Sequence, residues 1–431
     1  MNPIVKSTIK YILVFILTFT VLVSSLIAVA LIPREQIKPK AKESAAFFCD
    51  HEVQTLLIDF VKSSQNDYFA DCILLNIAYH LDKDHPVEST MKAAFYGRYD
   101  FNTGKYLRYS IINNMEPDHE YMRYWHGSIV PVRIMLLFWN IKQMYIFHAI
   151  LLTILLIVLM WLLAKNGFLA EGICLCISLI AVQIWFVPMA LEYTWMFLVM
   201  LIVSIIAVWL VCKGWTDHFG ELFLITGMVT VFLDFLTTET LTITVPLLFI
   251  LRLSEKKPLK ESNLALFSFK CCSLWLIGYI GMWVSKWIMA SIVLKMNVMP
   301  YVTEHIEERS VGSVGFSSLQ EYLIKAVTLN LKRLFPYEYG IFGAVLLFVV
   351  LFLTIMVPVL MNKVRLQSQI DWKRISLYFG LGLIPFVRLL IMHNHAVIHC
   401  FFAFRAFAAT VLAICFIGLE LVEKNERKET T

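Results

Sequence analysis

Long uninterrupted apolar runs recur along the chain, and Tyr11 to Ile32 is the first of them. A run of about 18 or more apolar residues can cross the hydrocarbon core as a helix, in which backbone polar groups pair internally. With 59% hydrophobic and 16% charged residues over 431 positions, the composition differs from that of soluble domains. We therefore predict an all-α, polytopic transmembrane protein.

The apolar runs predict about ten spanning helices, besides a short entering segment at 129–139. The predicted spans are 11–32, 143–164, 168–188, 193–212, 221–237, 240–252, 266–294, 341–361, 375–392 and 397–421. Ala28-Val29-Ala30 imitates a signal-peptidase site, but the first run is long enough to span, so we expect an uncleaved helix. This divides the chain into a first transmembrane helix (1–32), a loop (33–128) and a multi-span domain (129–431) with a second loop at 296–340.

Basic residues fall in alternate loops, and the positive-inside rule converts this pattern into a topology. The basic loops contain Lys165, Lys213, Arg252, Lys256, Lys257, Lys260, Lys363, Arg365, Lys373, Arg374, Lys424, Arg427 and Lys428. The opposite short loops, around Pro188 and Thr238, contain no lysine or arginine. We expect a multi-pass cell-membrane protein with both termini cytoplasmic and both long loops external. The net charge of +5 is spread over loops and does not indicate nucleic-acid binding.

The first loop has helical apolar spacing at Glu52–Lys62 and Asp71–Leu81, which predicts short amphipathic helices. Asp100–Tyr109 contains glycine and asparagine and is interpreted as a loop or a short hairpin. In the second loop, 319–334 is again amphipathic. Of the nine cysteines, only Cys49 and Cys72 lie in the large first loop, where a disulfide would require export.

The stretch from Arg388 to Arg405 concentrates polar groups between two apolar runs, and it also contains Asn394, His395 and His399. Ionisable residues at membrane depth are costly and usually face a cavity or a partner. On a helix, His395 and His399 share one face because they are four residues apart. The stretch is consistent either with a cationic pocket or with side chains that snorkel from a helix end.

Three further residues are candidates for the same external site. Asp71 can be a general base or a first-turn helix acid. Asp234 lies between Leu233 and Phe235, and this setting predicts burial with an arginine or histidine partner, or a substrate role. His126 either contacts a ligand or belongs to the aromatic anchor of the next helix.

These features together resemble the GT-C superfamily of polytopic glycosyltransferases, and especially uncharacterised bacterial membrane proteins of that type. The matching phrases are Tyr124-Trp125-His126-Gly127, Asp234-Phe235-Leu236-Thr237 followed by Pro246, and Asn394-His395 with His399, Phe401-Phe402 and Arg405. They are spread over 68–405. Arg34-Glu35 stands where an adjacent acidic pair is common in that superfamily.

The resemblance implies transfer of a sugar from a polyprenyl-phosphate-type donor to a cell-envelope acceptor on the external face. It assigns the catalytic role to Asp71, and it implies a possible divalent cation. Substrate binding is expected from His126, Asp234, Arg388, Asn394, His395, His399 and Arg405. The alternative is a non-catalytic transporter or flippase for a polar lipid, which would use the same pocket without a base. The expected partners are the lipid-linked donor and membrane lipids, and no sequence feature indicates an oligomeric state.

Overall fold

The computed structural model describes residues 3–98, 100, 102–311, 318–343, 345–346, 349, 364–366 and 369–424. Six helical stretches are long and apolar enough to cross a membrane. They are α1 (Pro3–Ala30), α7 (Ile141–Lys165), α9 (Leu191–Lys213), α12 (Leu264–Leu294), α16 (Trp372–Ile391) and the stretch Cys400–Leu421. The protein is thus mainly helical and has the composition and helix lengths of a membrane protein, as predicted.

Shorter helices complete the bundle. Three of them are α8 (Leu169–Ala181), α10 (Phe219–Leu233) and α11 (Leu241–Leu253). The run 168–188 is divided at Gln183, whose φ of 55° ends the helix before the 3-10 turn η2 (Ile184–Met189). The predicted span at 341–361 lies mostly outside the described residues.

The last predicted span, 397–421, is broken into several pieces. They are α17 (His393–Ile398), α18 (Cys400–Ala403), the 3-10 turn η5 (Phe404–Phe407) and α19 (Ala408–Leu421). The breaks fall where the polar side chains are concentrated. The backbone is therefore least regular at the end of the bundle where the candidate site lies.

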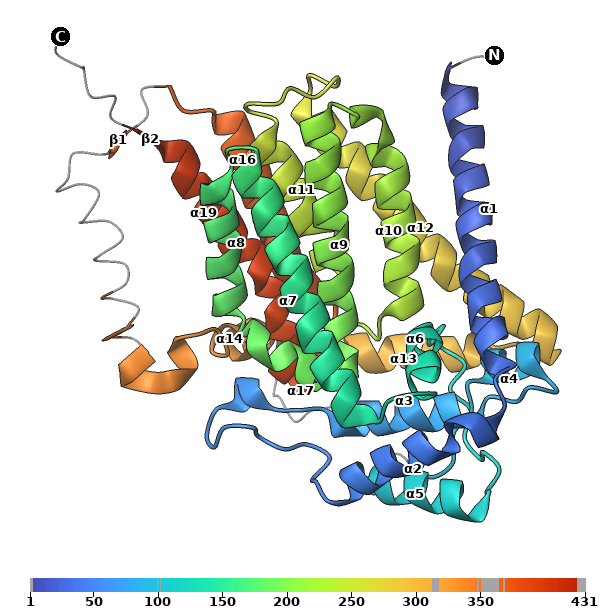
Figure 1. The fold of residues 1–431 in the computed structure, drawn as a ribbon. Coiled ribbons are helices and arrows are strands. Elements are labelled where there is room, and N and C mark those ends of the chain that lie inside the picture. The colour runs from blue at the N-terminus through green and yellow to red at the C-terminus, as the bar shows by residue number, and fades with distance from the viewer. Residues whose placement is uncertain are drawn as a thin grey trace, which may run out of the picture.

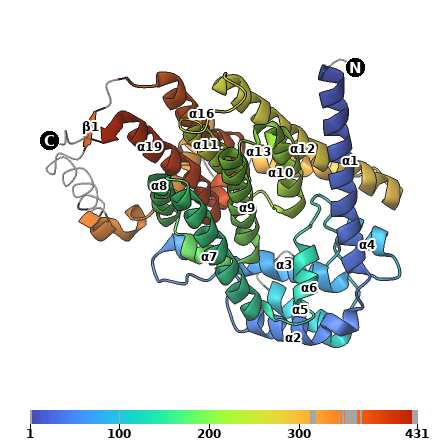
Figure 2. The ribbon, with the colours of Figure 1, turned by 45° about the horizontal axis from the view of Figure 1, so that its top comes forward.

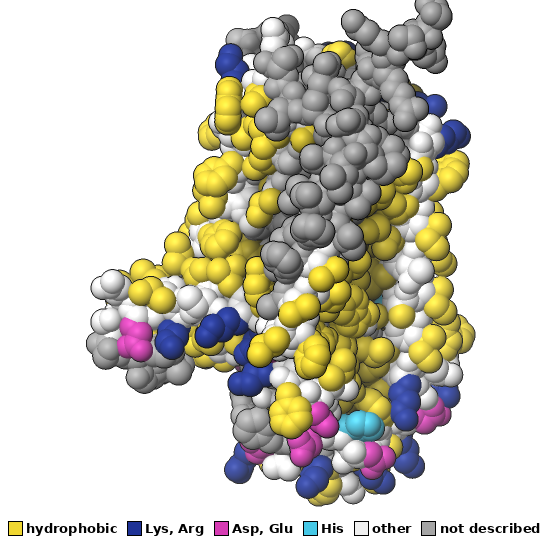
Figure 3. Space-filling model, turned by 90° about the vertical axis from the view of Figure 1, so that its left-hand side faces the viewer, with side chains coloured by type: hydrophobic (Ala, Val, Ile, Leu, Met, Phe, Trp, Pro, Cys, Tyr) yellow, Lys and Arg dark blue, Asp and Glu magenta, His cyan; other side chains and the backbone are white. Residues whose placement is uncertain are grey.

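α9 is the central helix and packs against α7, α10 and α11. α7 instead exposes Ile146, Ile150, Ile154 and Ile157, a row that suits contact with lipid. α10 and α12 approach each other through glycines: a Cβ on Gly227 would lie 2.0 Å from the Trp275 carbonyl oxygen. Close backbone approach through small residues is typical of membrane helix pairs. Figure 3 shows that apolar side chains form a broad band on the outside of the bundle, with charged side chains and a histidine gathered at its lower end.

The helices of the two long loops lie together at one end of the bundle (Figure 1). The first loop forms α2 (Arg34–Cys49), η1 (Lys62–Ser64), α3 (Tyr68–His80), α4 (Pro86–Lys92) and α5 (Thr103–Asn113), and α6 (Ile129–Met135) follows it. The second loop forms α13 (Met299–Val311), α14 (Leu319–Leu331) and η4 (Tyr337–Tyr339). Figure 2 shows α1 at one edge of the bundle, above α4 and α6.

The opposite end carries short connections, η3 (Thr216–His218), and the antiparallel pair β1 (Val364–Leu366) and β2 (Val422–Lys424). α1 begins and α19 ends at this end (Figure 1). Buried ion pairs join its helices: Arg252 Nε lies 3.0 Å from Glu171 Oε1, and Arg252 Nη1 lies 2.7 Å from Glu420 Oε2. These contacts connect α8, α11 and α19.

Two predictions for the first loop are wrong. Residues 52–62 form a loop in which Leu56 bridges Gln65, and the apolar side chain of Phe60 is 94% exposed, so the spacing marks no buried face. The stretch 100–109 belongs largely to helix α5, because Gly104 allows close packing on α2: a Cβ there would lie 3.0 Å from the Phe48 carbonyl oxygen. The glycine serves a helix contact and not a turn.

The helix predicted at 71–81 is confirmed as α3, although it is buried on nearly all sides. α2 was not predicted, since its Pro39 and polar composition conceal a helix that buries Ile37, Ala41, Ala45 and Phe48. Cys49 and Cys72 are both free thiols.

Candidate functional site

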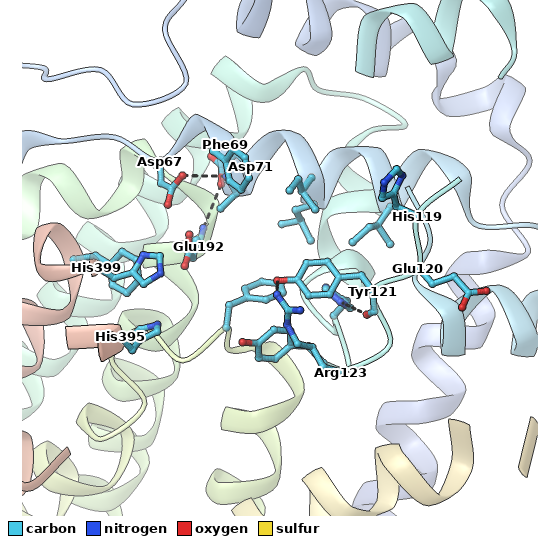
Figure 4. Close-up of a pocket in the computed structure, with 18 of the residues that line it drawn as sticks. Asp67, Phe69, Asp71, His119, Glu120, Tyr121, Arg123, Glu192, His395 and His399 are labelled. Carbon is cyan, nitrogen blue, oxygen red and sulfur yellow. Dashed lines mark hydrogen bonds between the residues drawn. The ribbon is translucent and has the colours of Figure 1, made fainter. Parts of the chain in front are cut away.

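A cavity of about 650 Å³ lies where the loop helices meet the bundle. Its walls come from α3, the segment 119–126, the N-terminus of α9, Phe235, α13 and the α17–α18 region. Figure 4 shows Asp67, Glu192, His395 and His399 toward one side of it, with His119 and Glu120 toward the other. The cavity thus joins Asp71, His126, His395 and His399, four of the residues that the sequence singled out.

Asp67 begins α3 as its N-cap, and its Oδ1 accepts a hydrogen bond from the Ala70 amide at 3.1 Å. Asp71 follows in the first turn and is fully buried. Burial raises the pKa of Asp67 to about 6 and that of Asp71 to about 7, although hydrogen-bond donors to each carboxylate partly oppose the shift. Both acids can therefore exchange protons near neutral pH.

The Asp71 carboxylate holds the N-terminus of α9. Both of its oxygens lie 3.0 Å from the Leu191 amide nitrogen, and one lies 3.4 Å from the Glu192 amide nitrogen. The Tyr145 hydroxyl donates to it at 2.6 Å. The first amides of a helix lack partners within the helix, so Asp71 acts as a cap supplied by another helix.

Glu192 is the acid that Asp71 positions. It lies in the first turn of α9, lines the cavity and is 7% exposed. Its side chain hydrogen-bonds Asp67, whereas Oε2 has no hydrogen-bond partner among the described residues. The sequence did not single out Glu192 as a site residue, because α3 and α9 are far apart in the chain.

His395 and His399 form the wall opposite the segment 119–126. Their ring centroids are 4.5 Å apart, as their spacing predicts, and the His399 ring stacks on Phe402 at 5.2 Å. Asn394 is buried behind them, where its side chain accepts a hydrogen bond from the Tyr322 hydroxyl. It does not line the cavity.

The segment 119–126 contributes an arginine that the sequence prediction omitted. The Arg123 guanidinium lies 4.2 Å from the Tyr121 ring centroid and 5.4 Å from that of Tyr124. The sequence feature that could have identified Arg123 is its position between Tyr121 and Tyr124, directly before the Tyr124-Trp125-His126-Gly127 phrase.

His126 is buried, and its Nε2 lies 3.0 Å from the Tyr121 carbonyl oxygen. Because a carbonyl only accepts, Nε2 carries the proton and Nδ1 is an acceptor. Burial lowers the His126 pKa to about 3, so the ring is neutral.

Besides Asn394, three predicted binding residues lie outside this cavity. Asp234 is buried, but its carboxylate accepts hydrogen bonds from the Thr237 hydroxyl at 2.6 Å and the Thr237 amide at 3.1 Å, in place of the predicted arginine or histidine. The guanidinium of Arg388 instead pairs with Glu239, with Nε 2.9 Å from Oε1. Glu239 lies on the connection between α10 and α11, within ion-pair distance of Arg388 on α16.

Arg405 is fully buried, and its guanidinium donates hydrogen bonds to backbone carbonyls. Its Nη1 donates to the Phe401 carbonyl and its Nη2 to the Ser63 carbonyl, each at 3.0 Å. Its guanidinium also lies 4.7 Å from the Tyr193 ring centroid. Arg405 thus fixes η1 of the first loop to the bundle.

A second, apolar groove of about 340 Å³ adjoins the cavity and shares Arg123 and Tyr124 with it. α12 supplies much of its wall, including Tyr279, Trp283 and Trp287. Val284, which also lines it, is 40% exposed on the outer side of the bundle. A polar cavity and an apolar groove therefore meet at one arginine.

No group of three histidine, cysteine or acidic side chains that could hold a metal ion is found in the part of the chain that the structure describes. Comparison with protein-family models, curated proteins and solved structures finds no match for the chain.

Proposed function

We propose that the protein is a membrane glycosyltransferase that transfers a sugar from a polyprenyl-phosphate-type donor. The observation that carries the proposal is the junction of the two cavities at Arg123. An amphiphilic donor has a polar sugar phosphate and a long apolar chain. The polar cavity fits the first part, and the groove along α12 fits the second.

The polar cavity supplies complementary chemistry for the transfer. The planar Arg123 guanidinium suits phosphate oxygens, and His395 and His399 face the same space. The acidic wall of Asp67, Asp71 and Glu192 provides a place for the proton that an acceptor hydroxyl releases. Asp71 contributes by holding α9 and by its negative charge.

We further propose that the chain crosses the membrane about ten times, with both termini cytoplasmic and the cavity at the external face. The basic short loops support this orientation. Both long loops and the cavity then share the compartment in which a cell-envelope acceptor would be found.

The alternative is a transporter or flippase for the same polar lipid. It would need a path through the opposite end of the bundle. There, Arg252 links Glu171 and Glu420 in buried ion pairs, which such a path would have to separate. This contact favours the enzyme.

The test is product formation by purified protein in lipid nanodiscs. Polyprenyl-phosphate sugars and an envelope extract as acceptor are supplied, and the release of free polyprenyl phosphate is followed by mass spectrometry. A transferase releases the lipid phosphate, whereas a transporter leaves the donor intact. Asp71→Asn should lower the rate, with the exposed Asp59→Asn as its control. Deletion of the gene should alter the cell-envelope glycans in parallel.

A further inference from the structure

Two carboxyl groups from different helices meet in the acidic wall. Asp67 at the start of α3 hydrogen-bonds Glu192 in the first turn of α9, and both side chains are more than nine-tenths buried. Ionised carboxylates only accept hydrogen bonds, so this contact requires one proton between the two groups. Figure 4 shows the two side chains next to each other on the same side of the cavity.

The surroundings favour retention of that proton. Asp71 and Asp234 add negative charge near Glu192, and Tyr193 follows it on α9. His395 and His399 from the α17–α18 region, His126 and Arg123 from the preceding segment and Glu304 from α13 line the same cavity. Arg405 is directed to the Tyr193 ring and to backbone carbonyls. Like charges in a buried site oppose full ionisation of the pair.

Asp71 is less suited to proton transfer than this pair. Its oxygens accept from Tyr145, Leu191 and the Glu192 amide. Glu192 Oε2, in contrast, is buried without a hydrogen-bond partner among the described residues, in a side chain that lines the cavity. Asp71 therefore positions Glu192, and the Asp67–Glu192 pair faces the ligand.

We propose that Asp67 and Glu192 share one proton and that this pair, not Asp71, accepts the proton in glycosyl transfer. The inference rests on the proposed function. The acceptor oxygen forms a bond to the anomeric carbon, and the bond from that carbon to the lipid-phosphate oxygen breaks, leaving its electron pair on the phosphate. The hydroxyl proton passes to the ionised member of the pair and later to water.

Infrared spectroscopy of the protein in nanodiscs tests the shared proton without any substrate. We expect a protonated-carboxyl C=O component at pH 7 that shifts in D₂O. Difference spectra between wild type and each variant isolate this component from that of Asp71, whose pKa of about 7 leaves it partly protonated at the same pH. Glu192→Gln and Asp67→Asn should each abolish or displace it, because each removes one end of the same hydrogen bond. Glu52→Gln, at an exposed acid, should leave it unchanged. An unchanged band in either Glu192→Gln or Asp67→Asn overturns the shared proton.

The transfer assay then tests the catalytic role. Glu192→Gln and Asp67→Asn should lower kcat by about 100-fold or more, as for loss of a general base. Glu192→Asp keeps a carboxyl on a shorter side chain and should retain part of the rate, which separates chemistry from misfolding. Wild-type transfer with undiminished rates in the amide variants removes the pair from catalysis. A band that behaves as expected without transfer by wild type refutes the proposed function and leaves the shared proton standing.

Discussion

The Asp71 carboxylate accepts a hydrogen bond from the Leu191 amide at 3.0 Å and so caps α9 from another helix. Substitution by alanine leaves that buried amide and the Tyr145 hydroxyl without an acceptor. At about pH 4, where the ionisation of Asp71 in the unfolded chain still costs little, we expect Asp71→Ala to destabilise the protein by about 1–3 kcal/mol, and Asp71→Asn by less because its amide oxygen still accepts. Thermal unfolding in nanodiscs measures both, with Asp59→Ala as the exposed control. Equal stability of Asp71→Ala and wild type would contradict the capping role.

Stability should also fall as pH rises through the acidic range. Burial raises the pKa of Asp71 to about 7, whereas an aspartate in an unfolded chain has a pKa of about 3.9. Below both pKa values, Asp71 is protonated in the folded and in the unfolded chain. Between the two pKa values, it is ionised only in the unfolded chain. The free energy of unfolding therefore falls by about 1.4 kcal/mol per pH unit because of this group until pH 7, and is constant above that pH. Asp71→Asn should flatten the decline; a slope equal to that of wild type would argue against the raised pKa.

The Arg405 guanidinium fixes the first loop through the Ser63 carbonyl. Lysine keeps the charge but cannot reach both Ser63 and Phe401 as a planar fork does. Because a hydrogen bond from a charged donor contributes about 1.5–3 kcal/mol, Arg405→Lys should reduce hydrogen-exchange protection at 61–66 by about 10- to 100-fold. Arg98→Lys, at an exposed arginine, is the control. Unchanged protection together with lost phosphate binding would instead support the substrate-binding role that the resemblance implied for Arg405.

Local sequence patterns predicted the longest apolar helices well because membrane helices must pair their backbone internally and expose apolar side chains. α9 and α12 lie within a few residues of their predicted bounds. The loop helices were harder: α2 and α5 depend on packing against each other at Gly104, which no local pattern reports.

The candidate site was predictable only where its residues are near in sequence. The spacing of His395 and His399 was sufficient, since ring proximity follows from one turn of helix. The contact of Asp67 with Glu192 joins segments 125 residues apart and was not foreseen. Arg388 and Arg405 were assigned to a ligand because their partners, the Glu239 side chain and the Ser63 carbonyl, lie on distant turns.

The membrane orientation can be tested with single cysteines at the two ends of the bundle. Lys62 in the first loop and Lys257 between α11 and α12 are both exposed. If basic loops face the cytoplasm, a membrane-impermeant maleimide should label Lys62→Cys in intact cells and Lys257→Cys only after lysis. The wild-type protein, with its native cysteines, gives the background. The reverse pattern would invert the proposed topology.

The apolar groove along α12 should admit the lipid chain of the donor. Val284 lines it and is 40% exposed, so Val284→Trp adds bulk inside the groove without disturbing the buried core. We expect binding of polyprenyl phosphate to weaken by about tenfold or more, because a few buried methylene groups contribute about 0.8 kcal/mol each. Ile277→Trp changes an exposed position two turns away on the same helix, outside the groove, and should bind as wild type does. Fluorescence titration in nanodiscs measures both affinities. Equal weakening by the two substitutions would indicate a general effect on α12, and normal binding by Val284→Trp would exclude the groove as the chain site.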